Sequence, residues 1–163
     1  MIYRYYQVIK TLQKMNIDYK VVEHPPAFTT EEADGYIKGH EGVRTKTLLL
    51  CDKRRTRYYM LVMEGSKRLD MKYFGTIIKE KGITFASEEA MMDKIMLKPG
   101  SVSLFGLLNN EERDIKVCLD DAMLNEEYVT FHGNDNTKTL FIATQDMYKF
   151  LEGLNYDYTV VKL

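Results

Sequence analysis

The chain has 163 residues, of which 45% are hydrophobic and 29% are charged, a composition typical of a soluble globular domain with a core of its own. Its formal net charge of −1 argues against a broad basic surface for nucleic acid, and no run approaches the roughly 20 apolar residues of a membrane span. The first residues lack the apolar core of a signal peptide, so we expect a cytoplasmic protein without DNA or a membrane as a partner.

The N-terminal part of the chain predicts two helices and one strand. Apolar residues recur at helical spacing over 2–12, and a strand over 19–22 ends before two prolines at 25–26, which cannot continue a ladder. The segment 29–32, Thr-Thr-Glu-Glu, is typical of a capping box that opens a short helix. Glycines spread over 35–42 then predict a connection without regular structure.

The middle of the chain predicts a hairpin followed by two capped helices. Asp70 and Ser87 are placed to cap the helices, and Gly82 suits the end of the first one. The expected elements, in chain order, are strands over 45–51 and 57–63 around a turn over 52–56, a helix over 70–81, a brief strand over 83–85, and a helix from 87 to 95.

The C-terminal part predicts further strands and one long helix, for which Thr144 is placed as the cap. Helices that alternate with about seven strands indicate an α/β or α+β fold, in a single domain that spans 1–163. The expected elements here are a short helix over 104–108, strands over 115–119, 128–132, 138–143 and 158–161, and a helix after 144.

Cysteine and histidine usage gives no sign of a metal or another cofactor. Cys51 and Cys118 both lie inside apolar strand-like runs, so we expect buried free thiols. His24, His40 and His132 are scattered, without the ligand spacing of a zinc site.

The densest basic run of the chain is Lys53-Arg54-Arg55, with Arg57 close behind. Charged residues are common in hairpin turns, and short basic runs are weak signals of nucleic-acid binding. We therefore interpret this run as a solvated turn. A small contact with one RNA end remains compatible with the net charge.

Two loops gather residues that hold ligands more often than they build cores. In the first loop, over 98–109, Pro99-Gly100 suits a tight turn, and Gly100 lets a ligand approach N–H groups as far as Val102. A plain turn capped by Ser101 fits equally well, and the glycine spacing of a phosphate loop is absent. In the second loop, over 131–137, an Asn/Asp/Gly run is first of all a hairpin turn.

His132 opens the second loop, and Lys46 stands at the entrance of an apolar strand. The histidine is a candidate base, a hydrogen-bond donor or an ordinary surface residue. The lysine is either an end residue whose stem covers apolar surface or a cation directed into a cleft. Ser101 has no histidine and aspartate partner by motif, so a serine-hydrolase triad has little support.

Six segments in a fixed order carry a resemblance to a known family. They are Lys46 to Lys53, Tyr58 to Val62, Gly65 to Asp70, Phe85 to Glu89, Pro99 to Asn109, and Phe131 to Thr137. This order resembles the YbaK/ProX superfamily of aminoacyl-tRNA editing domains, and within it the stand-alone prolyl-tRNA editing proteins. The resemblance runs from about Tyr19 to Leu163.

The resemblance implies a mixed, strongly curved sheet with helices packed around it, and hydrolysis of alanine mischarged onto the tRNA for proline. The implied partners are the acceptor end of aminoacyl-tRNA and a prolyl-tRNA synthetase. Lys46 matches the essential lysine, Gly100 and Ser101 the substrate loop, and His132 the pocket histidine. The expected substrate-binding residues are His24, Pro25, Phe28, Thr47, Val102, Asn134 and Asn136.

Three positions depart from the family's pattern. Thr47 stands where asparagine is frequent, Gly133 where proline is common after the histidine, and Leu104 where proline is frequent. The first change is expected to alter hydrogen bonding to the substrate, and the second to loosen the loop that positions His132. Both bear on the preferred amino acid more than on the reaction.

Selectivity is expected to follow from size, because a synthetase pocket built for proline discriminates against smaller alanine by only about 1–3 kcal/mol. Phe28, Ile37 and Leu48 are the candidate walls of a second, smaller pocket. Three alternatives stay open: a deacylase for cysteinyl-, seryl- or threonyl-tRNA, a non-catalytic module that binds an aminoacyl end or nucleotide, and an interaction protein with a methionine-rich surface.

Overall fold

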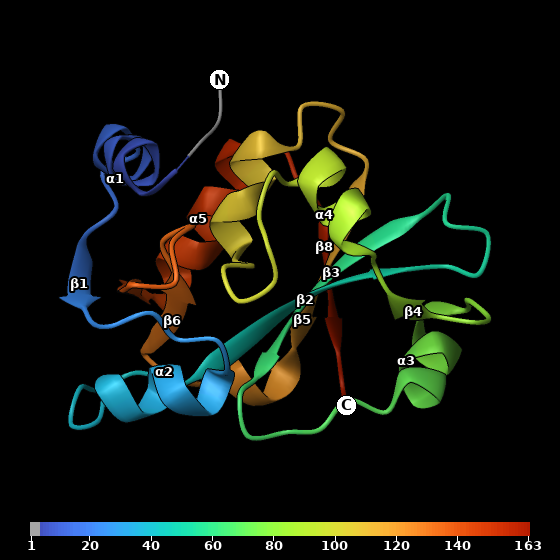
Figure 1. Ribbon diagram of the computed structural model, residues 1–163, viewed down its shortest axis with the longest axis horizontal. Coiled ribbons are helices and arrows are strands. Elements are labelled where there is room, and N and C mark those ends of the chain that lie inside the picture. The colour runs from blue at the N-terminus through green and yellow to red at the C-terminus, as the bar shows by residue number, and fades with distance from the viewer. Residues whose placement is uncertain (1–3) are drawn as a thin grey trace.

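The protein is described by a computed structural model that covers residues 4–163, in which helices pack around two β-sheets (Figure 1). The helices are α1 (Tyr5–Lys14), α2 (Thr30–Tyr36), α3 (Met71–Ile78), α4 (Glu88–Lys94) and α5 (Thr144–Gly153), with short 3-10 helices η1 (Leu104–Asn109) and η2 (Asp121–Met123). The strands are β1 (Tyr19–Glu23), β2 (Thr45–Cys51), β3 (Tyr58–Glu64), β4 (Thr84–Phe85), β5 (Ile115–Asp120), β6 (Tyr128–His132), β7 (Lys138–Ala143) and β8 (Tyr158–Val161).

The strands form two sheets, so the expectation of one strongly curved sheet with about seven strands is wrong. A three-stranded antiparallel sheet has the order β1-β7-β6, and a five-stranded mixed sheet has the order β4-β2-β3-β5-β8, which makes eight strands among residues 4–163. The sheets meet through a single bridge between Val43 and Val129, and the Thr45 hydroxyl then donates to the carbonyl of Thr130. Because a side chain takes the place of the next ladder bond, β2 and β6 do not continue as one sheet.

The expectation of an α+β class with a mixed sheet is confirmed. Within this fold, burial on both faces explains why β3 is the most apolar strand. Met60 and Val62 face the larger core, which the helices α1, α5 and η1 also enter. Leu61 and Met63 face a smaller cluster beneath Phe74 of α3. A strand covered on both faces reads as a continuous apolar run, as β3 does.

An aromatic cluster fills the centre of the larger core. The ring of Phe105 in η1 packs edge-on against Phe131 of β6 and Phe150 of α5, with centroids 5.6 Å and 5.2 Å apart. Edge-to-face pairs of this kind stabilise by about 0.5–1.5 kcal/mol beyond their area burial. The cluster fixes η1, and with it the preceding loop, against the end of β6.

The helix starts follow the expected caps in three cases. Thr29, Asp70 and Ser87 each accept a hydrogen bond from the backbone N–H three residues later. Thr144 does not cap α5, because Ala143 is the N-cap and the Thr144 hydroxyl donates to the Glu126 carbonyl instead. The side chain therefore ties α5 to the turn before β6.

Two helix boundaries differ from the expected ones. The helix α3 ends at Ile78 and not at residue 81, because Lys79 adopts a left-handed φ of 59° and the Glu80 N–H turns back to the Gly75 carbonyl. The first predicted helix began at Ile2, which lies outside the described residues, and the described helix extends from Tyr5 to Lys14.

Cys51 and Cys118 are buried free thiols, as expected. Burial raises the pKa of Cys51, and it raises the pKa of Cys118 to about 11. Neither thiol is therefore a nucleophile at neutral pH. Among residues 4–163, no helix has the length and apolar character to cross a membrane, and no three potential metal ligands gather in one place.

Candidate active site

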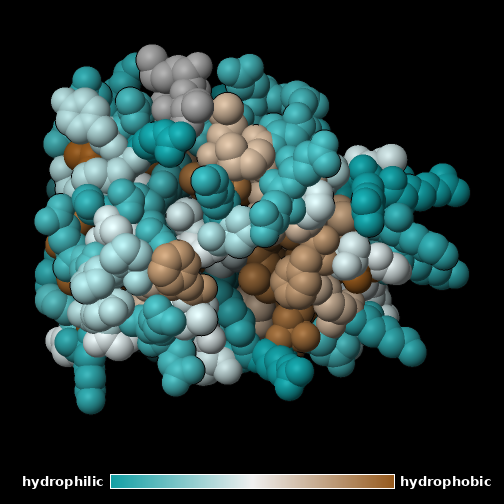
Figure 2. Space-filling view, in the orientation of Figure 1, coloured by the Kyte–Doolittle hydropathy of each residue, from teal (hydrophilic) through white to brown (hydrophobic). Residues whose placement is uncertain are grey.

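A cavity of about 290 Å³ opens between β2 of the larger sheet and β6 of the smaller one. Figure 2 shows a hollow near the centre of this face with apolar surface on both sides. The segments that line the cavity are α2 and the residues before it, β2, β4, α4, the loop before η1, and the ends of β6 and β7. Its walls include Phe28, Asp34, Ile37, Lys46, Thr47, Leu48, Phe85, Met91, Gly100, Val102, Thr130, His132 and Thr139.

About half of the site residues that the sequence predicted line this cavity. Those that line it are Phe28, Lys46, Thr47, Gly100, Val102 and His132, together with the candidate wall residues Ile37 and Leu48. Those that lie outside the lining are His24, Pro25, Ser101, Asn134 and Asn136.

Lys46 supplies a cation to the cavity from the second position of β2. Its side chain is half-buried, and its register partner on β3 is the fully buried Met63. Within residues 4–163 the Lys46 ammonium forms no ion pair or hydrogen bond. The cation is therefore available to an anionic or carbonyl oxygen of a ligand.

The loop before η1 lines the cavity and carries main-chain N–H groups that the protein does not fully use. The Ser101 N–H is used within the turn, where it donates to the Lys98 carbonyl at 3.1 Å. In the described part of the chain, the N–H groups of Gly100 and Val102 donate to no protein acceptor. The turn thus uses the Ser101 N–H, and the N–H groups of Gly100 and Val102 are available to a ligand.

Gly100 is required by backbone conformation and not by space. Its backbone φ is +90°, a value that residues other than glycine rarely adopt. A Cβ at this position would lie 3.8 Å from the Ala27 carbonyl oxygen and 3.9 Å from the Phe28 Cα, which are ordinary contacts. A substitution there therefore changes the turn itself before it fills the cavity.

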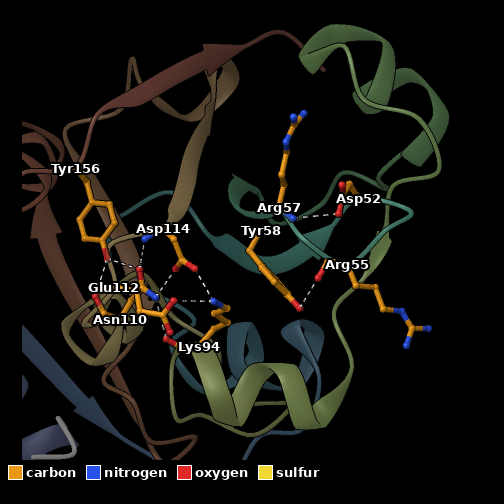
Figure 3. Close-up of polar contacts among 9 residues, drawn as sticks. All are labelled: Asp52, Arg55, Arg57, Tyr58, Lys94, Asn110, Glu112, Asp114 and Tyr156. Carbon is orange, nitrogen blue, oxygen red and sulfur yellow. Dashed lines mark hydrogen bonds and ion pairs between the residues drawn. The ribbon is translucent and has the colours of Figure 1, made fainter.

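A polar network fixes both ends of this loop (Figure 3). Lys94 at the end of α4 pairs with Asp114 at 2.5 Å, and the Asn110 amide donates to the carbonyl of Lys94 and to the Asp114 carboxylate. The buried Tyr156 hydroxyl donates to the Asn110 side-chain oxygen at 2.8 Å. With α4 and η1 held together, the main-chain donors between them keep a fixed direction.

His132 ends β6 inside the cavity wall. Its Nδ1 atom is buried and has no hydrogen-bond partner in the described chain. Burial lowers the pKa of His132, and the neighbouring His24 lowers it further. The ring is therefore neutral at pH 7, and a buried nitrogen without a partner is a position that a ligand can satisfy.

His24 lies outside the cavity lining and contacts one of the lining residues. Its Nε2 lies 2.8 Å from the hydroxyl of Thr139, which lines the cavity opposite His132 on β7. Its Nδ1 donates to the Pro25 carbonyl, and its ring stacks on Tyr36 of α2 at 5.3 Å. His24 thus joins α2 to the three-stranded sheet, and it reaches the cavity lining through its contact with Thr139 and its electrostatic effect on His132.

The asparagines of the second loop hold the site together without lining it. Asn134 is buried with a left-handed φ of 60°, accepts from the Ser103 hydroxyl at 3.0 Å and donates to the Phe105 carbonyl at 3.3 Å. The Asn136 carbonyl accepts the Ala27 N–H at 3.0 Å, which fixes the chain just before Phe28. The two loops are therefore mechanically joined.

Gly133 does not loosen the second loop as the sequence led us to expect. Its N–H donates to the Lys138 carbonyl, and a Cβ there would lie 2.9 Å from the Tyr5 ring and 3.1 Å from Leu140. The position is tightly packed against α1. A glycine is needed here because Tyr5 occupies the space of a side chain.

Sequence reasoning missed two kinds of lining residue. Asp34 of α2 lines the cavity, and burial raises the pKa of its carboxyl while the Arg44 cation opposes that shift. Thr130 and Thr139 add hydroxyls from β6 and β7. No pattern in the sequence marks these residues, because an aspartate in a short helix and threonines in strands are ordinary surface and sheet choices.

The profile of a known protein family fits this chain over most of its length. The family is described as the aminoacyl-tRNA editing domain, and it matches residues 24–150. The chain belongs to the aminoacyl-tRNA editing domain family. The match spans every cavity segment described above, from the residues before α2 to β7.

Relatives of this editing domain are similar over nearly their whole length. The Prolyl-tRNA editing protein ProX of Acetoanaerobium sticklandii is 28% identical over 156 residues, which cover 96% of this chain and 95% of that protein. The Prolyl-tRNA synthetase associated domain-containing protein 1 of Mus musculus is 30% identical over 145 residues, with 85% and 83% covered.

Solved structures share the fold. One described as a candidate trans-editing enzyme for prolyl-tRNA synthetase superposes with a TM-score of 0.74 at 19% identity, and covers 98% of this chain and 96% of that one. The resemblance inferred from the ordered segments is thereby confirmed. As a member of the editing family, the chain is an aminoacyl-tRNA deacylase, a hydrolase of the ester between an amino acid and its tRNA.

Proposed function

We propose that this deacylase removes alanine from the tRNA for proline, and that it acts in trans, in the cytoplasm, on tRNA that a prolyl-tRNA synthetase has mischarged. The names of the two relatives support the link to proline. One observation carries the proposal: one small cavity gathers the Lys46 ammonium and the N–H groups of Gly100 and Val102, and none of these donors has a partner within residues 4–163.

The chemistry requires little from the protein because an aminoacyl ester is already activated. Water adds to the carbonyl carbon, negative charge develops on the carbonyl oxygen, and the ribose oxygen leaves with a proton. The N–H groups of Gly100 and Val102 stabilise the developing charge, and Lys46 anchors the carbonyl or the terminal phosphate. The free hydroxyl of the terminal adenosine, a role that the family resemblance implies, assists the attacking water.

His132 orients the substrate in this scheme. Because its pKa is lowered, it is neutral when the enzyme works, and its buried Nδ1 meets the ester or the terminal ribose. Asn134, Asn136 and His24 are positioning residues, since each holds a lining segment without reaching the cavity.

The walls of the cavity, more than its volume, support a preference for a small amino acid. A volume of about 290 Å³ lies just below the range of about 300–1,000 Å³ that is usual for ligand pockets, so the cavity accepts only the end of the substrate. Ile37 is 1% exposed and Leu48 is half-buried, so both walls are backed by protein. A rigid wall excludes the larger ring of proline and admits the methyl group of alanine.

A deacylation panel tests the preferred substrate. The tRNA for proline is charged with alanine, cysteine, serine or proline, threonyl-tRNA is included, and release of each amino acid is followed under single-turnover conditions. We expect alanine to be released at least about 10-fold faster than the others, by the methylene-sized discrimination above. Fastest release of proline would overturn the size argument, and fastest release of cysteine, serine or threonine would select the alternative that Thr47 keeps open.

Asp34 is expected to hold the α-ammonium group of the substrate. It is the acidic residue of the cavity lining and forms no ion pair within residues 4–163. Asp34→Asn should lower kcat/KM for alanyl-tRNA about 10-fold, because the α-ammonium group then meets a neutral amide oxygen in place of a carboxylate of opposite charge.

Two comparisons make the Asp34 result specific. Glu31→Gln, on the exposed face of the same helix, should leave kcat/KM unchanged. With N-acetylalanyl-tRNA, which has no α-ammonium group, Asp34→Asn and the wild type should differ by less than about 2-fold. An equal loss on both substrates would mean that Asp34 has a structural role only.

A further inference from the structure

We infer that the turn between β2 and β3, together with the loop 79–82 beside it, is a docking surface for the phosphate backbone of the tRNA substrate. The inference rests on the proposed function only in that the substrate is a tRNA ester, and it does not depend on which amino acid is removed. The surface lies outside the cavity and at the right edge of Figure 1.

Charge is distributed very unevenly over the chain. The segments 52–57 and 79–82 carry six basic and two acidic residues among ten, a net charge of +4, while the formal net charge of the whole chain is −1. The rest of the chain therefore carries −5. A basic patch on an otherwise acidic protein attracts a polyanion to one place and repels it elsewhere.

The cations of this surface are available for binding. Lys53, Arg54 and Arg55 are exposed and form no ion pair within residues 4–163, and the same holds for Lys79 and Lys81. Both acidic residues are already engaged by neighbouring groups. Because these five cations form no ion pair in the described chain, they are free to contact phosphate groups, and the patch has a net charge of +4.

The two acidic residues build the turn, and their charge is already counted in its net charge of +4. The Asp52 carboxylate accepts from the N–H groups of Thr56 and Arg57 at 2.8 Å and 3.1 Å, and these bonds lower the pKa of Asp52. Glu80 pairs with Arg57 and accepts from the Tyr59 hydroxyl. Asp52 thus closes the turn, and Glu80 ties the loop 79–82 to β3.

The turn is preorganised with its side chains directed outward. Arg55 has a left-handed φ of 58°, and its carbonyl accepts from the Tyr58 hydroxyl at 3.4 Å. Figure 3 shows the side chains of Arg55 and Arg57 leaving the turn in different directions. A held loop loses less conformational entropy when it binds a partner than a mobile loop would.

The two loops form one surface. Cys51, the last residue of β2, and Thr84, the first residue of β4, are register partners. The turn after β2 and the loop before β4 therefore lie at the same end of the sheet. The stem of Lys53 packs over Gly82, where a Cβ would lie only 2.8 Å from the Lys53 Cβ. Gly82 thereby lets the basic turn lie directly against the second loop.

A path leads from the cavity to this surface. Phe85 lines the cavity and is the next residue after Thr84, so β4 connects the cavity wall to the basic loops. Phe28 and Phe85 both line the cavity and are 71% and 56% exposed, and exposed rings of this kind stack on unpaired bases. An RNA end held between these rings and directed along β4 brings its following phosphates to the basic turn.

The distance fits a nucleic-acid strand. Lys46 and Asp52 are six positions apart along β2 and its end, or roughly 20 Å at about 3.3 Å per residue. A strand whose end lies at Lys46 reaches the turn within its first several nucleotides. In Figure 2 hydrophilic side chains project from this right edge, beyond the apolar surface beside the hollow.

The test removes two charges from the turn and compares two substrates. In the variant Arg54→Gln/Arg55→Asn, asparagine is chosen because it tolerates the left-handed conformation of residue 55. The substrates are full-length alanyl-tRNA for proline and the 3′-alanyl ester of adenosine, which has no phosphate backbone. The matched control is Lys10→Gln/Lys14→Gln on α1, which removes the same charge on the opposite side of the molecule (Figure 1).

We expect kcat/KM on tRNA to fall about 10-fold through KM, with kcat and the rate on the adenosine ester unchanged. The slope of log kcat/KM against log salt should lose about one unit for each arginine removed. Anisotropy with uncharged tRNA should show the same weakening of binding, and the α1 control should show none of these effects.

Three results would overturn the docking surface: wild-type affinity for tRNA in the turn variant, an equal loss on the adenosine ester, or an equal loss in the α1 control. The proposed function fails separately. If wild-type protein released no alanine from any tRNA but still bound uncharged tRNA through the turn, the docking surface would stand and the proposed substrate would not.

Discussion

Replacing Lys46 with alanine is expected to lower the rate of deacylation about 100- to 1,000-fold. The substitution removes the cation that the cavity presents to the carbonyl or the terminal phosphate, and the loss of one donor to a developing oxyanion has an effect of this size. The measurement is single-turnover release of alanine from alanyl-tRNA at saturating enzyme, which reports chemistry separately from binding.

The effect should be purely functional, because Lys46 forms no ion pair or hydrogen bond in the described chain. The matched control is Lys116→Ala, which removes an exposed lysine from β5 of the same sheet, and it should keep wild-type activity. His132→Asn should lose less than Lys46→Ala, because we assign orientation and not charge stabilisation to that ring. Full activity of Lys46→Ala would end the assignment of this lysine to the reaction.

Gly100→Ala is expected to lower deacylation about 10- to 100-fold while the protein remains folded. The φ of +90° is strained for alanine, by of the order of 1–3 kcal/mol, and the chain relieves this strain by rotating the peptide groups on either side. That rotation redirects the N–H groups of Gly100 and Val102, which we propose stabilise the oxyanion. The readouts are single-turnover kinetics and the free energy of unfolding by denaturant.

Gly39→Ala provides a matched control for this strain. Gly39 has a φ of +91°, nothing lies within 4 Å of a Cβ built there, and the residue is outside the cavity lining. Both variants should lose a similar free energy of unfolding, and only Gly100→Ala should lose activity. Equal activity in the two variants would mean that the direction of the main chain at Gly100 does not matter for hydrolysis.

The local structure could be predicted well because its causes are local. The caps Thr29, Asp70 and Ser87 act within one helical turn, and the apolar run of β3 reflects burial on both faces. The helix α3 was predicted too long because nothing in 79–81 forbids a helix, and its end depends on a backbone bond from Glu80 to Gly75. The bond from Glu80 to Gly75 ends the helix, while continued helical bonds would have extended it by one turn. The pattern of residues does not show which of these two sets of bonds is more stable.

The sheet arrangement could not be predicted because it depends on contacts between distant segments. The hydroxyls of Thr45 and Thr130 bond to main-chain carbonyls where ladder bonds would have joined β2 to β6. The tight packing of Gly133 likewise depends on Tyr5, which is 128 positions earlier in the chain. The resemblance implied the family correctly but implied one curved sheet where there are two.

The sequence by itself determined the helix and strand types, the buried thiols, the family and several cavity residues, because periodicity, caps and motif order are properties of neighbouring residues. Only the tertiary structure decided which residues share the cavity, since that depends on how β2, β6 and the loop before η1 meet. It added Asp34 to the lining and placed Asn134 and Asn136 outside it. It also showed that two main-chain donors of the lining have no acceptor within residues 4–163. It also turned a weak basic run into a surface, because the turn and the loop 79–82 come together only at the end of β2 and β4.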